Sequence, residues 1–401
     1  MNYEQSYRRL ISGQSSGFGT SMLRFLLGLA AIGYSLVVRL RNLLYSKGLL
    51  KVYHVDATVL CVGNITVGGT GKTPLVVWLC NLITQNPKLK TQNCKCAILT
   101  RGYKARAQEN KDFKDEIAIL AESCPEAEVI VNPDRVAGAA EAIGKYAAKV
   151  LIMDDGFQNR RLARDLDIAA IDATQPFGYG KMLPAGLLRE PVSSLNRAGA
   201  VVITRCDQID GAELNGLEKK LRAINPDMVI AKSIHAVVSV KYPEPSVIPA
   251  KAGIQKSSEK MDSCLRRARP VLDTGNDNIE QLKGKKVFAF CGIGNPDAFL
   301  NTIKNLGAEL AGSKIYDDHY HYTDACLTEI SEQAEELGAD LILTTQKDWT
   351  KVISNSKFPI SESKSPLPFA YLAIEIKFLA GEDKLTALIK DTLAGKITQK
   401  L

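Results

Sequence analysis

A glycine-rich stretch between a predicted strand and a predicted helix limits the fold of this chain more than any other feature. Residues 62–79 read VGNITVGGTGKTPLVVWL, and they follow a short apolar run at 57–62. A strand, a glycine-rich loop and a helical pattern in this order form the context that a phosphate-binding P-loop requires. We therefore expect the chain to bind the phosphates of a nucleotide at this loop.

The residues of the loop have separate predicted roles. The glycines allow backbone N–H groups to converge on phosphate oxygens, and the helix N-terminus adds the positive end of its dipole. Lys72 is expected to reach the β- and γ-phosphates, and the Thr73 hydroxyl to bind Mg²⁺. The residues predicted to contact the nucleotide are Thr66, Val67, Gly68, Gly69, Thr70, Gly71, Lys72 and Thr73.

The loop departs from the common G-x-x-x-x-G-K-[ST] pattern at its first position. That pattern has glycine where this chain has Thr66, and the nearest upstream glycine is Gly63. A glycine-rich turn that only joins a strand to a helix is the alternative interpretation. The combination of strand, GGTGKT and helix favours the P-loop.

A pair of carboxylates at the end of another predicted strand fits a metal ion. In KVLIMDDGFQNRRL (149–162), four apolar residues are followed by Asp154 and Asp155. Mg²⁺ usually takes one or two carboxylates together with substrate phosphates. We predict that one of these aspartates binds the metal, and the sequence leaves open which. Gln158 is expected to support the metal shell or to position the substrate, and Asp155 also counts among the predicted catalytic residues.

Short apolar runs alternate with helical patterns along most of the chain. This alternation predicts an α/β fold with a P-loop NTPase-type parallel sheet covered on both faces. Because 401 residues exceed what one core usually fills, a second, smaller α/β domain is expected after residue 285. The predicted strands lie at 57–62, 96–100, 150–153, 167–171 and 200–204, and the second set lies within 286–307, 340–345 and 369–378.

An apolar segment near the N-terminus is predicted to be a helix that associates with a membrane. Residues 25–38 carry no charge, and Arg24, Arg39 and Arg41 flank them. Because the uncharged run is shorter than the ~20 residues of a full span, we expect a helix that lies in or dips into the bilayer, with its arginines at anionic head groups. A buried core helix and a signal peptide are the alternatives. Whether the helix spans the bilayer stays open.

Composition narrows the classes of partner. The net charge of +7 suits anionic partners such as nucleotides, phosphorylated lipids or a bilayer surface, and it does not require nucleic acid. The nine scattered cysteines indicate reduced thiols and a reducing compartment. With four histidines, no histidine-built metal site is expected. We expect a monomer that binds no nucleic acid.

A nucleotide switch would have a different sequence around the loop. Regulatory P-loop ATPases of the partition-ATPase or metallochaperone type carry a lysine directly before Gly-Gly, where this chain has Val67. A GTPase would show Asn-Lys-x-Asp, and the nearest stretch, TQKD at 345–348, lacks the asparagine. A membrane-tethered switch remains the alternative hypothesis, but both absences favour phosphoryl transfer.

Several motifs together resemble the tetraacyldisaccharide 4′-kinase family of lipid A biosynthesis. They occur in order from the N-terminal helix to near residue 380, interrupted chiefly by 241–277. The motifs are GNITVGGTGKTP, LTRGYK (99–104), PDRVAGA (133–139), DDGFQNRRLARDLDI (154–168), GKMLPAGLLREP (180–191), FCGIGNPDAF (290–299), DHYHYTD (318–324) and TTQKD (344–348).

The resemblance implies an activity, a location and a domain organisation. The implied reaction is ATP- and Mg²⁺-dependent, in-line phosphorylation of the 4′-hydroxyl of tetraacyldisaccharide 1-phosphate to give lipid IVA, at the cytoplasmic face of the bacterial inner membrane. The expected organisation is a membrane-associating helical segment at 1–50, a P-loop kinase domain at 51–235, a linker at 236–284 with a flexible insertion at about 241–277, and a smaller domain at 285–401 that closes over the nucleotide.

The resemblance also implies roles for individual residues. Asp134 pairs with His319 in a dyad that activates the hydroxyl, although Asp134 also suits a helix N-cap and His321 lies two residues from His319. Further candidates for substrate or phosphate contact are Arg101, Arg189, Glu190 and Asn295. A surface ion pair is the alternative for Arg189 and Glu190, and a polar cap for Asn295.

Overall fold

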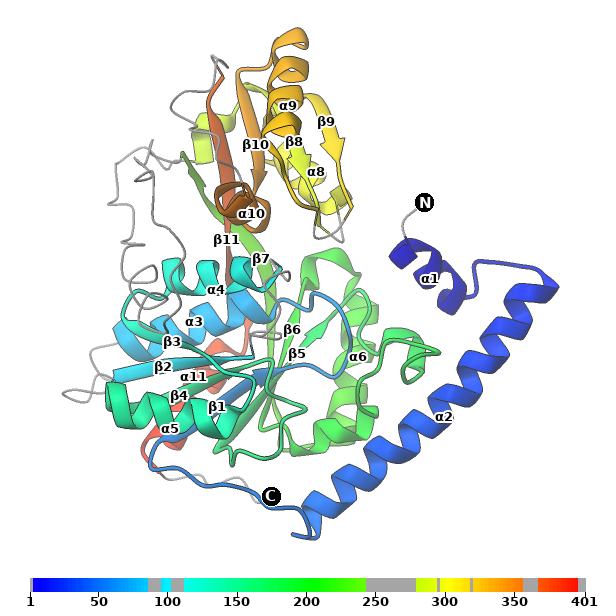
Figure 1. Ribbon diagram of the computed structural model, residues 1–401, viewed down its shortest axis with the longest axis vertical. Coiled ribbons are helices and arrows are strands. Elements are labelled where there is room, and N and C mark those ends of the chain that lie inside the picture. The colour runs from blue at the N-terminus through cyan, green and yellow to red at the C-terminus, as the bar shows by residue number, and fades with distance from the viewer. Residues whose placement is uncertain are drawn as a thin grey trace, which may run out of the picture. The chain divides into compact units, whose positions relative to one another are not determined.

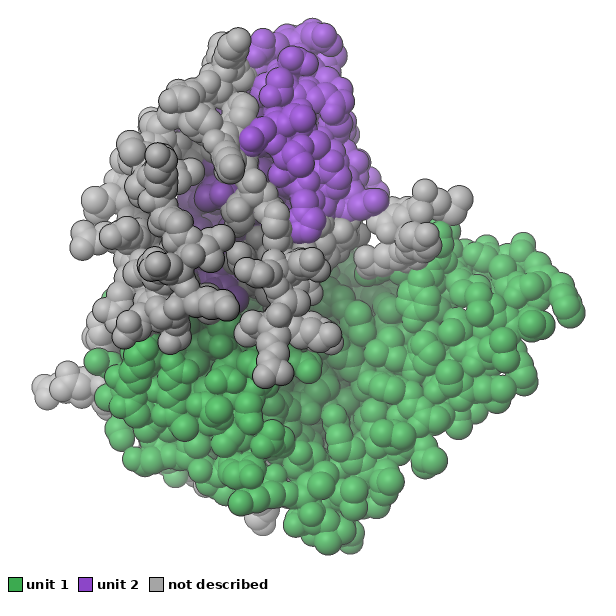
Figure 2. All heavy atoms as spheres, in the orientation of Figure 1, with its two compact units in different colours: residues 1–104, 126–235, 376–401 green, residues 105–125, 236–375 purple. Residues whose placement is uncertain are grey.

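The computed structural model describes residues 3–85, 95–101, 112–242, 279–293, 296–317, 320–355 and 367–395. The chain forms two compact units (Figure 2). Unit 1 comprises 1–104, 126–235 and 376–401, and unit 2 comprises 105–125 and 236–375. The insertion predicted at about 241–277 lies outside the described residues from 243 onward.

Unit 1 contains a mostly parallel sheet with the P-loop strand near its centre. The strand order is β3-β2-β4-β1-β5-β6-β7-β11, and β1 pairs in parallel with β4 and β5. The strands are β1 (Thr58–Gly63), β2 (Lys95–Thr100), β3 (Ala127–Val131), β4 (Ala148–Asp154), β5 (Leu166–Asp172), β6 (Ala200–Thr204), β7 (Val229–Lys241) and β11 (Phe369–Ala380). Unit 1 also contains the helices α3 (Lys72–Gln85), α5 (Arg135–Tyr146), α6 (Gly211–Ile224) and α11 (Glu382–Leu393).

The central strands of unit 1 are buried on both faces, which explains why they read as continuous apolar runs. On one face, Ala169 and Val201 pack with Leu217 of α6. On the other, Val59 and Leu151 pack in a second cluster that includes α5. Because the carboxyl ends of parallel strands share one edge of a sheet, the segments that follow β1, β4, β5 and β6 meet there.

Unit 2 is a smaller α/β unit with its own core. Its strand order is β7-β11-β10-β8-β9, and β8 pairs in parallel with both β9 and β10. The new elements are α4 (Asp112–Ser123), β8 (Lys286–Cys291), α8 (Pro296–Asn305), β9 (Glu309–Ile315), α9 (Asp324–Glu336), β10 (Leu341–Thr345) and α10 (Gln346–Asn355). The fully buried side chains of Asp348 and Lys351 form an ion pair of 3.0 Å inside this unit.

The N-terminal segment of unit 1 forms helices α1 (Tyr3–Ser12) and α2 (Phe18–Ser46). Helix α2 is a single long helix (Figure 1), and it is long and apolar enough to cross a membrane. Ala31 and Val38 are its buried residues and pack on unit 1. The large exposed apolar residues of α2 are Phe18, Met22, Leu23, Phe25, Leu26, Leu29, Ile32, Leu36, Val37, Leu40 and Leu43.

The structure confirms the predicted fold class, a largely parallel α/β fold preceded by a long apolar helix. Strands β3, β7 and β9 were not among the predicted strands. The compact units also divide the chain differently from the predicted boundaries, because 376–401 belong to unit 1 and 105–125 to unit 2. Strands β7 and β11 each belong partly to both units, so no single boundary in the sequence separates them.

Candidate active site

The predicted P-loop connects β1 to α3, with Gly63 ending the strand and Lys72 beginning the helix. Gly68 and Gly71 have φ angles of 118° and 81°, which favour glycine. At Gly71 space is also lacking, because a Cβ there would lie 2.5 Å from Nε2 of His235. The backbone of the loop therefore depends on glycine at these positions.

One side of the loop is fixed to the segment that carries the LPAGLLREP motif. The Val67 N–H donates to the Leu187 carbonyl at 2.8 Å, and the Arg189 N–H donates to the Ile65 carbonyl at 2.7 Å. Inside the loop, Nδ2 of the buried Asn64 donates to the Thr70 hydroxyl at 2.9 Å. The sequence predicted both segments as functional, and the structure brings them together.

The P-loop lysine contacts a predicted metal-binding carboxylate. Nζ of Lys72 lies 3.5 Å from the carboxylate of Asp155, which follows β4. Arg189 Nη1 also donates to both oxygens of this carboxylate, at 3.0 and 2.9 Å. Burial raises the pKa of Asp155, but the cations of Lys72 and Arg189 outweigh burial and the pKa is lowered. Asp155 is therefore ionised at neutral pH.

Neighbouring residues at the end of β4 complete this edge of the site. Asp154 is buried, and its backbone carbonyl accepts from Nη2 of the buried Arg135 at 2.9 Å. Gln158 donates to the Asn64 carbonyl at 2.7 Å and accepts from Arg189 at 3.4 Å. The structure thus joins Gln158 to both the loop and the Asp155 cluster.

The donor set at this edge suits a hard cation. The available ligands are carboxylate oxygens of Asp154 and Asp155 and the Thr73 hydroxyl at the start of α3. Within the described residues no three His, Cys, Asp or Glu side chains gather as a metal site. A metal held here would take its remaining ligands from phosphates and water, and this is the preference of Mg²⁺.

Asp134 occupies the N-cap of α5. Its side chain accepts from the Val136 N–H at 3.0 Å, so the N-cap interpretation of the sequence is confirmed. Its other oxygen lies 3.4 Å from Nη1 of Arg161, and both side chains are about half exposed. The capping bond uses one carboxylate oxygen and leaves the second at the surface. His319, its predicted partner, lies outside the described residues, as does Asn295.

Two other candidates, Arg101 and His321, lie in exposed connecting segments. Arg101 follows β2 and is exposed, and His321 precedes α9 in unit 2 and is also exposed. Both make interactions within the protein. Their predicted roles stay predictions.

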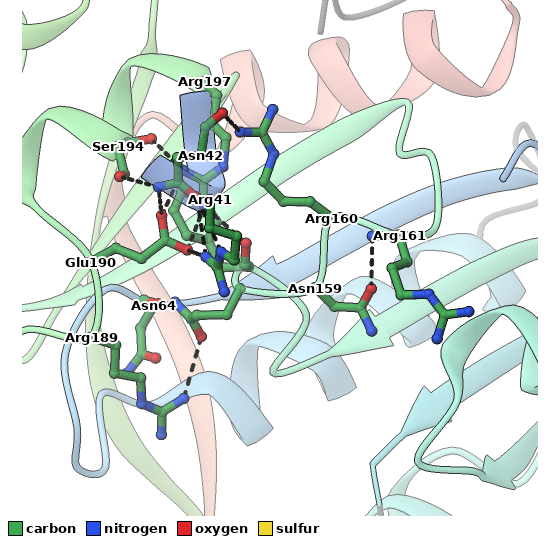
Figure 3. A network of polar contacts seen from close by, with 12 residues as sticks. Arg41, Asn42, Asn64, Asn159, Arg160, Arg161, Arg189, Glu190, Ser194 and Arg197 are labelled. Carbon is green, nitrogen blue, oxygen red and sulfur yellow. Dashed lines mark hydrogen bonds and ion pairs between the residues drawn. The ribbon is translucent and has the colours of Figure 1, made fainter. Parts of the chain in front are cut away.

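Glu190 was predicted to contact substrate or phosphate, with a surface ion pair as the alternative, and the structure shows a buried residue that pairs with arginines of the protein itself. Its side chain is fully buried and accepts from Nη1 and Nη2 of Arg197 at 2.9 and 3.1 Å (Figure 3). Arg41 and Asn42 of α2 also donate to it, at 3.2 and 3.0 Å. Burial raises the pKa of Glu190, but its hydrogen bonds and the two guanidinium groups lower it below the ordinary value. Glu190 therefore fastens α2 to the sheet domain of unit 1, while its neighbour Arg189 binds Asp155.

Three residues at the site were not predicted from the sequence. The Thr204 hydroxyl and Arg205 Nη2 donate to the carbonyls of Thr70 and Gly69 in the loop. His235 of β7 packs against Gly71. Thr204 could have been found, because it ends a predicted strand at the same edge of the sheet as the loop. His235 gave no such signal, since β7 was not predicted.

A phosphate loop at the carboxyl edge of a parallel sheet, with its lysine beside a strand-end carboxylate, defines a P-loop nucleotide-binding protein. The family model described as tetraacyldisaccharide-1-P 4′-kinase (LpxK) matches residues 23–394. The chain therefore belongs to the tetraacyldisaccharide 4′-kinase family, as the motifs indicated, and it is an enzyme of the phosphotransferase class.

Curated and structural relatives agree with this assignment. The tetraacyldisaccharide 4′-kinase of Halothermothrix orenii is 33% identical over 342 residues, which cover 82% of each chain. That of Chlorobaculum parvum is 31% identical over 389 residues, 93% of this chain and 96% of the relative. A crystal structure of "apo" form LpxK from Aquifex aeolicus in complex with ATP matches with a TM-score of 0.63 and 26% identity, over 92% of this chain and 99% of that one.

Proposed function

We propose that this chain transfers the γ-phosphoryl group of ATP to the 4′-hydroxyl of tetraacyldisaccharide 1-phosphate, giving lipid IVA and ADP. The observation that carries the proposal is the contact between Lys72 and Asp155 beside the loop. In this contact the cation predicted to bind phosphate lies beside a carboxylate predicted to bind the metal, and this supports the proposal. The family match supplies the acceptor.

Binding of ATP would begin at the loop. The N–H groups near the start of α3 face the phosphates, and Lys72 exchanges its Asp155 partner for phosphate oxygens. Arg189, held beside Asp155, is a second cation for the charge that develops on the transferred group. Mg²⁺ held by Asp154, Asp155 or Thr73 would neutralise phosphate charge.

The acceptor hydroxyl needs a base, because its proton leaves as the new bond forms. We assign this role to the pair of Asp134 and His319, on the strength of the family resemblance. The 4′-oxygen bonds to the γ-phosphorus, the bond from phosphorus to the β,γ-bridging oxygen breaks, and ADP leaves with that electron pair. The hydroxyl proton passes to the Asp134–His319 pair.

The N-terminal helix gives the enzyme access to a substrate that stays in the bilayer. Each buried CH₂ of an acyl chain contributes ~0.8 kcal/mol, so a tetraacylated sugar does not leave the membrane. The exposed apolar residues of α2 would enter the bilayer from the cytoplasmic face of the inner membrane. A hollow of about 490 Å³ between α2 and residues 181–185, lined mainly by apolar side chains, suits an acyl chain.

Incubation of the purified chain with γ-labelled ATP and disaccharide 1-phosphate in detergent micelles tests the proposal. We expect label on the lipid, and mass spectrometry of the product is expected to place it on the 4′-oxygen. ATP hydrolysis without labelled lipid would indicate a nucleotide switch and would contradict the proposal. Label on a different hydroxyl would contradict the assigned acceptor position.

A further inference from the structure

Two carbonyl groups of the phosphate loop accept hydrogen bonds from Thr204, the last residue of β6, and from Arg205, which follows it. The Thr204 hydroxyl donates to the Thr70 carbonyl at 3.0 Å, and Arg205 Nη2 donates to the Gly69 carbonyl at 2.8 Å. We propose that Arg205, assisted by Thr204, is a positioning residue for the nucleotide. Arg205 fixes the Gly69 carbonyl, and the N–H of the same peptide, that of Thr70, donates to the Gly68 carbonyl at 3.1 Å, so this turn of the loop is held. Thr204 holds the next carbonyl, that of Thr70, away from the phosphate site, so that the Gly71 N–H faces that site.

The geometry of the peptide links these contacts to phosphate binding. In a trans peptide the C=O and N–H groups point to opposite sides. Because the Thr70 carbonyl points to Thr204, the Gly71 N–H in the same peptide points away from β6. Lys72 begins α3 at the next residue, so this N–H joins those of the helix N-terminus. Rotation of the peptide would instead aim a carbonyl at the phosphates.

Arg205 is suited to this task because both ends of its guanidinium group are fixed. Nη1 pairs with Oδ2 of Asp172 at the end of β5, and Nη2 bonds to the loop. Oδ1 of Asp172 accepts in turn from the N–H and the hydroxyl of Thr174, at 3.0 and 2.7 Å. The network therefore runs from β5 through Arg205 to Gly69. A lysine ammonium lacks the planar fork that holds both partners at once.

Arg205 has a left-handed backbone conformation, which is uncommon for a residue other than glycine and fits a functional position. Its φ of 56° and ψ of 39° lie in the left-handed region, which costs free energy for a residue with a Cβ. Such outliers cluster at ligand sites, where the surroundings hold them in place. The side chains of Arg205 and Asp172 are 21% and 12% exposed, so solvent screens this pair less than an ordinary surface pair.

His235 closes the same side of the loop as a neutral group. Its Nε2 is buried, and no described residue forms a hydrogen bond with it. Burial and the Arg205 cation lower the pKa of His235 to about 4, against the opposing effect of Asp172. The imidazole is therefore uncharged near pH 7 and adds no second cation beside Arg205, which leaves the guanidinium to hold the loop carbonyl.

The inference rests on ATP being the bound nucleotide, so the test measures ATP binding apart from turnover. In Arg205→Met we expect the Kd for ATP, measured by titration calorimetry, and the KM for ATP each to rise about tenfold, with the KM for the lipid unchanged. Arg205→Lys is expected to lie between Met and wild type. Arg222→Met is the matched control, because Arg222 also donates to a carbonyl, that of Met228 at 2.8 Å, but lies on α6.

The outcomes separate this proposal from the proposed function. Wild-type affinity for ATP in Arg205→Met would overturn the positioning role alone. An equal loss of affinity for ATP and lipid would also overturn it, because general disruption of the fold explains that result. If Arg205→Met does not fold, the affinities for ATP and for the lipid are compared in Arg205→Lys and Asp172→Asn instead. A wild-type chain that binds no ATP would overturn both proposals.

Discussion

The Lys72 ammonium at the start of α3 lies 3.5 Å from the Asp155 carboxylate that follows β4. We propose that this anion holds the lysine until a phosphate takes its place. Arg189 binds the same carboxylate at 2.9 Å, so Asp155 would keep a cationic partner if Lys72 moved to a nucleotide. Either cation can therefore pair with the carboxylate. Substitution of Lys72 is expected to affect catalysis and stability separately.

Lys72→Met is expected to lower kcat by at least ~10²–10³-fold while the fold persists, because the variant removes a cation aimed at developing phosphate charge. Asp155 keeps Arg189, and the lysine side chain is near the protein surface at 15% exposed. Labelled-phosphate transfer and thermal melting measure the two effects. Lys149→Met removes an exposed lysine at the start of β4 as a control. Turnover in Lys72→Met equal to that of the control would refute the role of Lys72.

The sequence predicted the parts of the fold whose pattern is local. The apolar runs of β1, β4, β5 and β6 and the spacing of the loop were visible in it, because strands buried on both faces lack polar residues. Strand β7 was missed because Lys232, Ser233 and His235 interrupt its apolar residues. Strand β9 was missed because it is mostly not buried.

The site contacts that the sequence did not predict join residues far apart along the chain. Thr204 bonds to a carbonyl 134 positions earlier, and Arg41 pairs with Glu190 across 149 positions. Nothing in a local pattern specifies which strand ends meet. The motif that contains Arg189 and Glu190 was identified, but the opposite directions of these neighbours depend on tertiary packing, which buries one and turns the other to the loop.

Glu190 is expected to make the stability of unit 1 depend on pH. Its folded pKa is lowered below the ordinary value of about 4.5, so its pairing stabilises the fold above that pH and the contribution is lost as pH falls through the folded pKa. Glu190→Gln should therefore lower the free energy of unfolding by about 2 kcal/mol at pH 7, and by less at pH 4. Urea unfolding at both pH values measures this.

The control for Glu190 is Glu218→Gln, which removes a partly exposed carboxylate on α6 that pairs with Lys232 at 2.8 Å. Exposed pairs contribute about 0–1 kcal/mol, so this variant should change stability little at either pH. A loss in Glu190→Gln that has the same size at pH 7 and pH 4 would show that charge is not the cause.

The buried pair of Asp348 and Lys351 is expected to be essential for the stability of unit 2. Lys351 Nζ also donates to the Gly292 carbonyl at 3.2 Å, and Asp348 accepts from the Gly292 N–H at 3.0 Å. Lys351→Met leaves a fully buried carboxylate without its cation, which should cost about 3–5 kcal/mol. Thermal melting checks this, with Lys304→Met, an exposed position on α8, as control. Restoration of part of the loss by Asp348→Asn in the Lys351→Met background is also expected.

Gly71→Ala is expected to abolish ATP binding through two separate effects. The φ of 81° is unfavourable for alanine, and the new methyl group would lie 2.5 Å from Nε2 of His235 and 3.2 Å from the Thr204 methyl. Because the Gly71 N–H is proposed to face the phosphates, any shift of this backbone would move a donor. Titration calorimetry with ATP is expected to show a loss of at least ~100-fold, the size of removing one preorganised donor.

A second substitution separates these two effects. His235→Ala in the Gly71→Ala background removes the collision but leaves the unfavourable φ, so only part of the ATP affinity should return. Gly144→Ala in α5 is the matched glycine control, because no atom outside its own helix backbone lies within 4 Å of where the new methyl group would be, and its φ is not left-handed. That variant should bind ATP as wild type does and be slightly more stable, since alanine favours helix. Full recovery of binding in the double variant would show that steric contact alone, and not the backbone angle, requires glycine at position 71.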